Sequence, residues 1–238
     1  MLELRELVKH YPMASGEPVK AVDGVSLTVA QGEFVALYGP SGSGKTTLLE
    51  LIAGLKEADS GEVLVNGRDV LKMSRKESHI YRLKQLGIIG QPRSLMPGAR
   101  AVQNASLKLL LANVRKAQPT IEPLLCQLGL GNRLQHRTEQ LSMGERQRVL
   151  IALALSMDPE LVLADEPTGS LDTQRTREVL GLLRDLCHAR QMALVLATHD
   201  PQAAYFADQV HELRDGHLTE YRPDHMPAES AAALPEGA

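Results

Sequence analysis

Residues 39–46 read GPSGSGKT, and this segment most constrains what the chain can fold into. It follows an apolar run at 33–38 and precedes the apolar run LLELI at 48–52. The segment fits the pattern G-x-x-x-x-G-K-[ST], in which backbone N–H groups converge on a phosphate at the start of a helix. A glycine/serine turn that happens to carry a lysine is the competing interpretation, and it explains neither flanking run. We therefore expect a strand, a phosphate-binding loop and a helix, in that order.

The residue types in this loop predict roles around a bound polyphosphate. Lys45 is a flexible point charge that would reach the β- and γ-phosphates. The hydroxyl of Thr46 would take one position on an octahedral Mg²⁺ ion, and Thr47 would assist at the α-phosphate. The candidate nucleotide-binding set is Gly39, Pro40, Ser41, Gly42, Ser43, Gly44, Lys45, Thr46 and Thr47.

Two carboxylates end a second apolar run, residues 161–165. Asp165 and Glu166 would be costly to desolvate there unless a cation or a catalytic water used them. Asp165 is thus a candidate Mg²⁺ ligand through the water shell of the ion, and Glu166 a candidate general base for attack on the γ-phosphate. A strand-end helix cap is the alternative interpretation. His199 follows the next apolar run, 193–197, and is expected at the same edge of a parallel sheet.

Composition argues against several other classes of protein. A formal charge of −3 over 238 residues gives no broad basic field for gripping nucleic acid. Cys126 and Cys187 are far apart and lack C-x-x-C spacing, so neither a disulfide framework nor a thiolate metal site is expected. Residues 1–6 do not resemble an export signal, and no apolar run approaches the roughly 20 residues that cross a bilayer. Any membrane role is expected to come through a partner.

The order of apolar runs, turns and helical periodicity predicts how the chain is organised. Short strands at 2–8, 25–29 and 62–65, the last leading into the turn Asn66-Gly67, indicate an antiparallel β subdomain. From residue 91 to about 157 the pattern becomes helical, which predicts an inserted helical subdomain. The expected ranges are 1–90 and 158–221 for the core with the β subdomain, 91–157 for the helical subdomain, and 222–238 for a disordered tail.

A serine and a glutamate mark the start of one helix in the segment LSMGE at 141–145. On local grounds Ser142 and Glu145 form a capping box of the type S-x-x-E. A helix N-terminus with a hydroxyl and a glycine amide is also an anion site, so the segment could contact a γ-phosphate. The two interpretations are compatible.

Together these motifs resemble the nucleotide-binding subunit of ABC (ATP-binding cassette) transporters over essentially all of residues 2–221. The resemblance implies an α/β fold of the P-loop NTPase (RecA-like) type, with an antiparallel β subdomain and an inserted α-helical subdomain. Within the superfamily, residues 164–172 look like the branch of lipoprotein-release, macrolide-efflux and cell-division ATPases. The parts it implies are the Walker A loop at 39–46, the Walker B strand at 161–166, the Q-loop glutamine Gln91, the signature Leu141, Ser142, Met143, Gly144 and Glu145, the D-loop Ser170, Leu171 and Asp172, the switch histidine His199, and Tyr11 stacked on adenine.

The resemblance also implies a mechanism and partners. Two subunits would close head to tail with ATP between the Walker A loop of one and the signature of the other. Glu166 and His199 would be catalytic, and Thr46, Gln91 and Asp165 would hold Mg²⁺. An integral-membrane permease would dock on the helical subdomain, holding the subunit at the cytoplasmic face of the plasma membrane.

Candidate docking residues for that permease lie between 91 and 104, where Leu95, Met96 and Val102 are expected to form a small apolar surface. A basic run lies nearby and is expected to be a solvated helix face, with acidic lipid head groups or permease carboxylates as alternative partners. It consists of Lys72, Arg75, Lys76, Arg82 and Lys84.

Some residues depart from the family pattern, and two other functions are compatible with the same motifs. A cell-division ATPase that regulates cell-wall hydrolases through a membrane partner is the main alternative. A soluble ABC ATPase acting on DNA or ribosomes is disfavoured, because the chain has neither a long coiled coil nor a second cassette. Met143 replaces a common signature glycine, and Gly90 and Leu153 also depart from the pattern. Met143 would strain the backbone at positive φ but would change little in helical φ/ψ.

Overall fold

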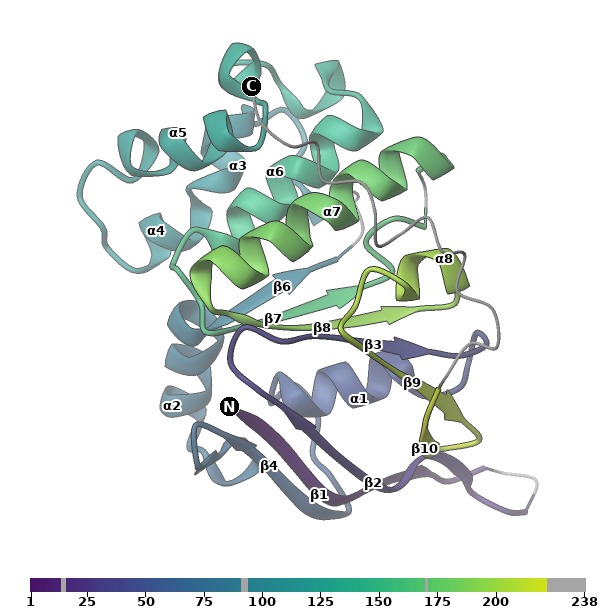
Figure 1. Cartoon of the computed structure of the whole chain (residues 1–238). Helices are drawn as coiled ribbons and strands as arrows, with labels where there is room; N and C mark the ends of the chain where they lie inside the picture. The colour runs from purple at the N-terminus through teal and green to yellow at the C-terminus, as the bar shows by residue number, and fades with distance from the viewer. Residues whose placement is uncertain (14–15, 91–93, 170, 222–238) are drawn as a thin grey trace.

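The larger of two sheets forms the centre of the molecule in the computed structural model, which describes residues 1–13, 16–90, 94–169 and 171–221 (Figure 1). Its strand order is β10-β9-β3-β8-β7-β6. In this sheet only β10 is antiparallel to its neighbour. The other pairings of the described strands are parallel, as the sequence predicts for the runs at 161–165 and 193–197. The strands are β3 (Phe34–Tyr38), β6 (Leu86–Ile89), β7 (Leu161–Asp165), β8 (Ala193–Thr198), β9 (Gln209–Arg214) and β10 (His217–Glu220).

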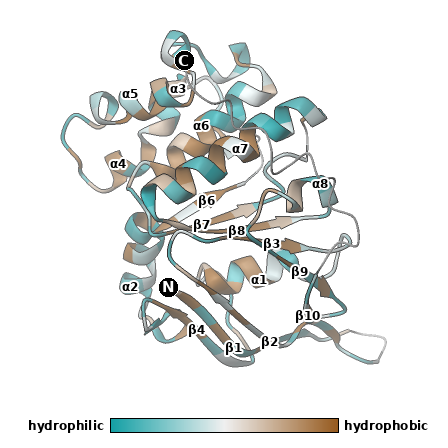
Figure 2. Ribbon diagram, viewed as in Figure 1, coloured by the Kyte–Doolittle hydropathy of each residue, from teal (hydrophilic) through white to brown (hydrophobic). Residues whose placement is uncertain are grey.

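The central strands are buried on both faces because their apolar side chains alternate between two cores. Phe34 and Leu194 belong to the core on the side of the long helices, whereas Val35 and Val195 belong to the core on the opposite side. In Figure 2 these strands are brown along their length, whereas the long helix α7 (Thr173–Arg190) mixes brown with teal. Continuous apolar runs thus produce the parallel sheet predicted from the sequence.

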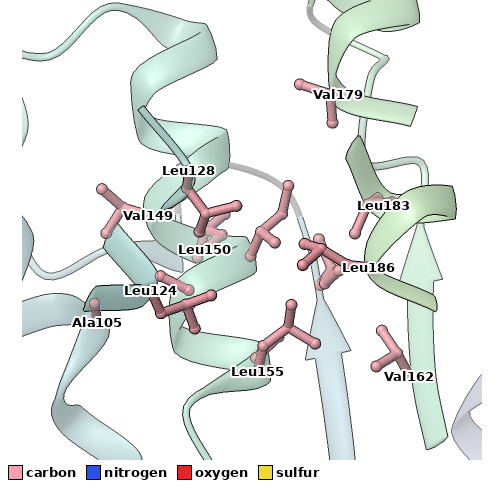
Figure 3. Packing of buried hydrophobic residues seen from close by; sticks show 14 of the residues in the cluster. Ala105, Leu124, Leu128, Val149, Leu150, Leu155, Val162, Val179, Leu183 and Leu186 are labelled. Carbon is pink, nitrogen blue, oxygen red and sulfur yellow. The ribbon is translucent and has the colours of Figure 1, made fainter. Parts of the chain in front are cut away.

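Two long helices cover one face of the sheet. They are α6 (Met143–Leu155) and α7, and Figure 3 shows Leu150 and Leu155 of the first near Leu183 and Leu186 of the second. Full burial of each such side chain stabilises the fold by roughly 1.5–3 kcal/mol. The short helix α8 (Pro201–Ala204) follows β8. The sheet and these helices together hold the carboxyl ends of β7 and β8 in place.

A smaller antiparallel sheet lies across helix α1 (Lys45–Ile52) from the large sheet (Figure 1). Its order is β2-β1-β4-β5. The strands are β1 (Leu2–Tyr11), β2 (Val19–Val29), β4 (Ser60–Val65) and β5 (Arg68–Asp69), so β1 and β2 are longer than the sequence predicted. Asn66 and Gly67 both have positive φ between β4 and β5, which confirms the predicted hairpin turn.

Helices fill the chain between β6 and β7. They are α3 (Ala101–Ala105), α4 (Leu107–Leu111), α5 (Ala117–Gln127) and α6. The prediction of an exposed apolar surface in this region is wrong for two of its three residues, because Leu95 is only 4% exposed and Val102 is fully buried. Both pack in the core shared with α6, whereas Met96 is 39% exposed. The helical periodicity predicted the helices but not which face each one buries.

The remaining elements are short. They are η1 (Val70–Lys72), α2 (Arg75–Ile80), η2 (Tyr81–Gln85), η4 (Gly131–Arg133) and η5 (Thr138–Gln140). Within the described ranges, no helix combines the length and the hydropathy needed to span a bilayer. The tail at 222–238 lies outside the described residues.

Candidate nucleotide-binding and catalytic site

The glycine-rich loop connects β3 to α1 and packs tightly against its surroundings. Gly44 has φ 102°, and a side chain there would collide with the carbonyl oxygen of Ala21 on β2. A side chain at Gly39 would likewise collide with the carbonyl oxygen of Leu213 on β9. These two positions need glycine because neighbouring backbone leaves no room for a Cβ.

Lys45 is folded into this loop. Its side chain is nearly buried, and Nζ donates to the carbonyl oxygens of Gly39 at 2.7 Å and Pro40 at 2.9 Å. Burial lowers the pKa of the Lys45 amine, while the nearby carboxylates Glu166 and Asp165 oppose that shift. The position suits a cation that exchanges carbonyl partners for phosphate oxygens.

An unpaired hydroxyl in the same loop supports a phosphate ligand. Ser43 is 8% exposed, and its Oγ has no hydrogen-bond partner in the part of the chain that the structure describes. A buried hydroxyl without a partner is unfavourable unless a ligand supplies one. The loop therefore has a donor ready for an anion.

Thr46 and Asp165 bring two oxygen ligands together. Thr46 Oγ1 at the start of α1 donates to Asp165 Oδ2 at the end of β7 over 2.9 Å. Burial raises the pKa of the Asp165 carboxyl, the bond from Thr46 opposes this, and the charge of Glu166 adds to it. A hydroxyl beside a carboxylate is the hard-oxygen donor set that Mg²⁺ prefers, so these residues fit the predicted ion.

Glu166 and His199 are joined at the ends of adjacent strands. His199 Nδ1 lies 2.7 Å from Glu166 Oε1. Glu166 has φ 47°, an uncommon left-handed conformation for this residue type, and its N–H donates to Ala197 at 3.0 Å. Both side chains line a cavity of about 350 Å³ with Thr168, Thr198 and Asp200. The prediction that the two strand ends converge is confirmed by this contact.

The segment at 141–145 forms the predicted capping box at the start of α6. Glu145 N donates to Ser142 Oγ at 3.3 Å, and Ser142 N donates to Glu145 Oε2 at 2.7 Å. Met143 is the first residue of the helix and is not among the residues of positive φ in the described chain. The backbone strain considered for Met143 is therefore absent there.

Comparisons with known proteins identify the family of the chain. The family model for ABC transporters matches residues 22–169. The chain belongs to the ABC transporter family of ATP-binding subunits. A lipoprotein-releasing system ATP-binding protein, LolD 2, of Chlorobaculum tepidum is 40% identical over 92% of this chain and 91% of that protein. A macrolide export ATP-binding/permease protein, MacB, of Marinobacter nauticus is 39% identical over 99% of this chain but only 36% of that protein.

Solved ABC cassettes have the same fold. The dimeric structure of MJ0796, a bacterial ABC transporter cassette, matches with a TM-score of 0.82 and 31% identity over 94% of this chain and 100% of that one. A dimeric post-hydrolysis structure of MJ0796 bound to ADP and Pi matches equally well. The predicted fold class and ATPase family are thereby confirmed.

Tyr11 of this ABC ATPase, expected to stack on adenine, lies at the end of β1 beside two lysines. Lys56 Nζ donates to the Tyr11 hydroxyl at 2.9 Å and lies 5.1 Å from the ring centroid, and Lys9 Nζ lies 5.7 Å from it. Lys56 also pairs with Glu50 at 2.9 Å. Adenine stacking stays a prediction. The sequence did not indicate the contact with Lys56, because Lys56 lies 45 positions after Tyr11 in the chain.

Other ABC motif residues are only partly described. Asp172, in the expected D-loop, caps α7 by accepting from Arg175 N at 2.9 Å, and Leu171 packs against the core. Gln91 and Ser170 lie outside the described residues. Their assigned roles stay predictions.

Gln147 is a buried polar residue that no sequence motif indicates. It is fully buried on α6, and its Nε2 donates to the carbonyl oxygen of Gly90 at 3.5 Å. Its Oε1 has no partner within the described ranges. This contact joins the helix of the signature to the residue before Gln91, and only the fold reveals it.

Proposed function

We propose that this subunit hydrolyses Mg·ATP and uses the cycle to drive a membrane permease, in lipoprotein release or export. The observation that carries the proposal is the convergence of Lys45, the Thr46–Asp165 pair and the Glu166–His199 pair at the carboxyl ends of β3, β7 and β8. In open α/β sheets this edge is the ligand site. The names of LolD 2 and MacB favour release or export over cell-wall regulation.

The residues of the chain divide the chemistry between them. Lys45 and the Ser43 hydroxyl would hold phosphate oxygens, and Thr46 with Asp165 would hold Mg²⁺, together with the predicted ligand Gln91. The ion would neutralise charge on the β- and γ-phosphates.

Glu166 would accept a proton from the attacking water. The water oxygen would bond to the γ-phosphorus while the bond between the γ-phosphorus and the leaving ADP oxygen breaks. His199 would orient the Glu166 carboxylate through the contact at 2.7 Å and would steady the γ-phosphate. The acceptor and its orienting partner thus come from adjacent strands.

A head-to-tail dimer would complete each site. Across the described residues, no hydrogen bond or ion pair joins the signature at 141–145 to the loop at 39–47. The signature is therefore free to contact ATP bound by a second copy, as the dimeric state of MJ0796 suggests. Differential binding of ATP over ADP would then close and open the pair.

The permease would dock beside the edge strand β6. Ile88 on that strand is 41% exposed, Leu55 after α1 is 56% exposed, and Met96 is 39% exposed. We name these three side chains the permease surface, which replaces the surface that included Leu95 and Val102. MacB carries the word permease in its name, which supports a permease as the partner of this cassette. Such a partner would hold the subunit at the cytoplasmic face of the membrane.

Capture of the closed state tests the proposal. Tagged Glu166→Gln protein would be incubated with solubilised membranes of the native host and Mg·ATP, and a Met96→Cys version would be crosslinked to its partner. A polytopic protein that crosslinks at position 96 is expected. The matched control adds Lys45→Ala, which should remove ATP binding and with it the ATP-bound dimer, while the crosslink to the permease at position 96 should remain. Recovery of ribosomes or DNA alone would overturn the membrane assignment while leaving the ATPase intact.

A further inference from the structure

Acidic residues are absent from a long internal stretch of this acidic protein. No Asp or Glu occurs between Glu77 and Glu122, whereas lysines and arginines recur from Arg82 to Lys116. The whole chain has a formal charge of −3. Positive charge is thus segregated into the part of the chain that carries β6, α3 and α4.

Helix α4 is held against the edge of the large sheet. Lys108 Nζ on α4 donates to the carbonyl oxygen of Leu86, the first residue of β6, at 2.6 Å. Strand β6 is the edge strand and also carries Ile88 of the permease surface. Figure 1 shows α4 on the same side of the molecule as the start of β6 and α2. Surfaces on α4 therefore adjoin the expected permease side.

Two adjacent leucines on α4 point outward beside two cations. Leu109 is 4% exposed and anchors the helix in the core, whereas Leu110 and Leu111 are 52% and 61% exposed. The turn that follows carries Arg115 and Lys116, both exposed. Neither cation makes an ion pair in the described part of the chain. We call Leu110, Leu111, Arg115 and Lys116 the α4 surface.

The basic run predicted from the sequence differs from this surface. Lys72 pairs with Asp69 at 2.8 Å, and Arg82 donates to the carbonyl oxygen of Gly54 at 2.9 Å. Those two side chains are engaged in the fold, whereas Arg75, Lys76 and Lys84 of the run are exposed and make no ion pair in the described ranges. The cations of the α4 surface likewise have no such partner among the described residues, and they follow two adjacent exposed leucines by only a few positions in the chain.

We propose that the α4 surface binds directly to an anionic membrane, with Arg115 and Lys116 on phospholipid phosphates and the two leucines at the boundary of the acyl chains. Exposed apolar side chains next to unpaired cations match the two layers of an anionic membrane interface. A permease would have to supply both a carboxylate and an apolar patch at matching positions, whereas an anionic membrane presents phosphates above acyl chains over its whole surface. This inference rests on the proposed function at a membrane, but the chain should bind anionic lipid without the permease.

Vesicle co-sedimentation of the purified full chain, without permease or nucleotide, tests this proposal. Binding to phosphatidylglycerol-containing vesicles is expected, with loss at high ionic strength and little binding to pure phosphatidylcholine. The Arg115→Ala/Lys116→Ala variant should bind about 25-fold more weakly, from about fivefold per cation. Its matched control is Arg177→Ala/Arg214→Ala, which removes equal charge from two exposed positions elsewhere and should bind like wild type.

The leucines are tested separately. Leu110→Ser/Leu111→Ser should weaken binding at both low and high ionic strength, and Val19→Ser, an exposed apolar residue of β2, serves as its control. Equal binding to neutral and anionic vesicles, or an equal loss in both cation variants, would overturn the proposal. Binding only to vesicles that also contain the permease would assign the surface to a protein partner. A chain that recovers its permease but not anionic vesicles would overturn this inference alone.

Discussion

Glu166 Oε1 and His199 Nδ1 lie 2.7 Å apart, at the carboxyl ends of neighbouring strands β7 and β8. The contact positions the carboxylate of Glu166, a residue whose backbone is in the left-handed region. Uncommon backbone conformations at a site persist only where the surroundings stabilise them. Here the adjacent strand provides both a backbone acceptor, Ala197, and the histidine.

Replacement of Glu166 by Gln should separate ATP binding from hydrolysis. The amide keeps the shape of the side chain but cannot accept the proton, so we expect turnover to fall by at least about 100-fold. ATP affinity should stay near wild type, and the ATP-bound dimer should accumulate in size-exclusion chromatography. A variant that hydrolyses ATP at the wild-type rate would remove Glu166 from its catalytic role.

Asp165→Asn should retain or raise stability while abolishing the response to Mg·ATP. Burial raises the pKa of the Asp165 carboxyl, so the folded state binds more protons there and stability falls as pH rises from the ordinary pKa through the raised one. The uncharged amide of Asn does not incur the cost of burying an ionised carboxylate. Without nucleotide, we expect its Tm at neutral pH to equal or exceed that of wild type, with the difference shrinking at acid pH. Added Mg·ATP should raise the Tm of wild type only.

Lys108→Met should stabilise the protein at neutral pH. Burial lowers the pKa of the Lys108 amine to about 8. Between about pH 8 and the ordinary lysine pKa of about 10.4, residue 108 therefore binds more protons in the unfolded chain than in the folded protein. The free energy of unfolding of the wild type consequently rises with pH over that interval. The advantage of the variant in chemical denaturation should shrink as pH rises. The exposed Lys116→Met control should show no such trend, and an advantage independent of pH would contradict this account.

Met143→Gly should leave ATP-driven dimerisation unchanged. Met143 already lies in the first turn of α6, inside an intact capping box, so no backbone strain is released. Glycine lowers helix stability by at most about 1 kcal/mol, which predicts a small loss of Tm. Dimerisation would be measured in the Glu166→Gln background by light scattering. A clear gain in ATP-dependent dimer would show that the methionine weakens closure.

Local patterns predicted much of the fold and of the candidate site. The phosphate-binding loop, the buried strands ending at Asp165 and before His199, the Asn66-Gly67 hairpin and the Ser142–Glu145 capping box depend on residues close in sequence. Each of these elements follows from local backbone geometry and from the spacing of apolar residues along the chain. These elements could therefore be predicted without knowledge of the tertiary contacts.

Other features depend on which distant segments meet. Thr46 and Asp165 are separated by 119 positions yet share a hydrogen bond, and Gln147 reaches Gly90 across 57 positions. Leu95 and Val102 looked like surface residues because the apolar pattern does not say which partner covers a face.

The sequence alone determined the chemistry of the loop, the strand ends and the helix caps, since these follow from local residue types. Only the tertiary structure decided that Met143 is unstrained, that Lys108 is tied to the edge strand, and that Leu110 and Leu111 stay exposed. Burial and side-chain partners are properties of packed neighbours, and those neighbours come from all parts of the chain.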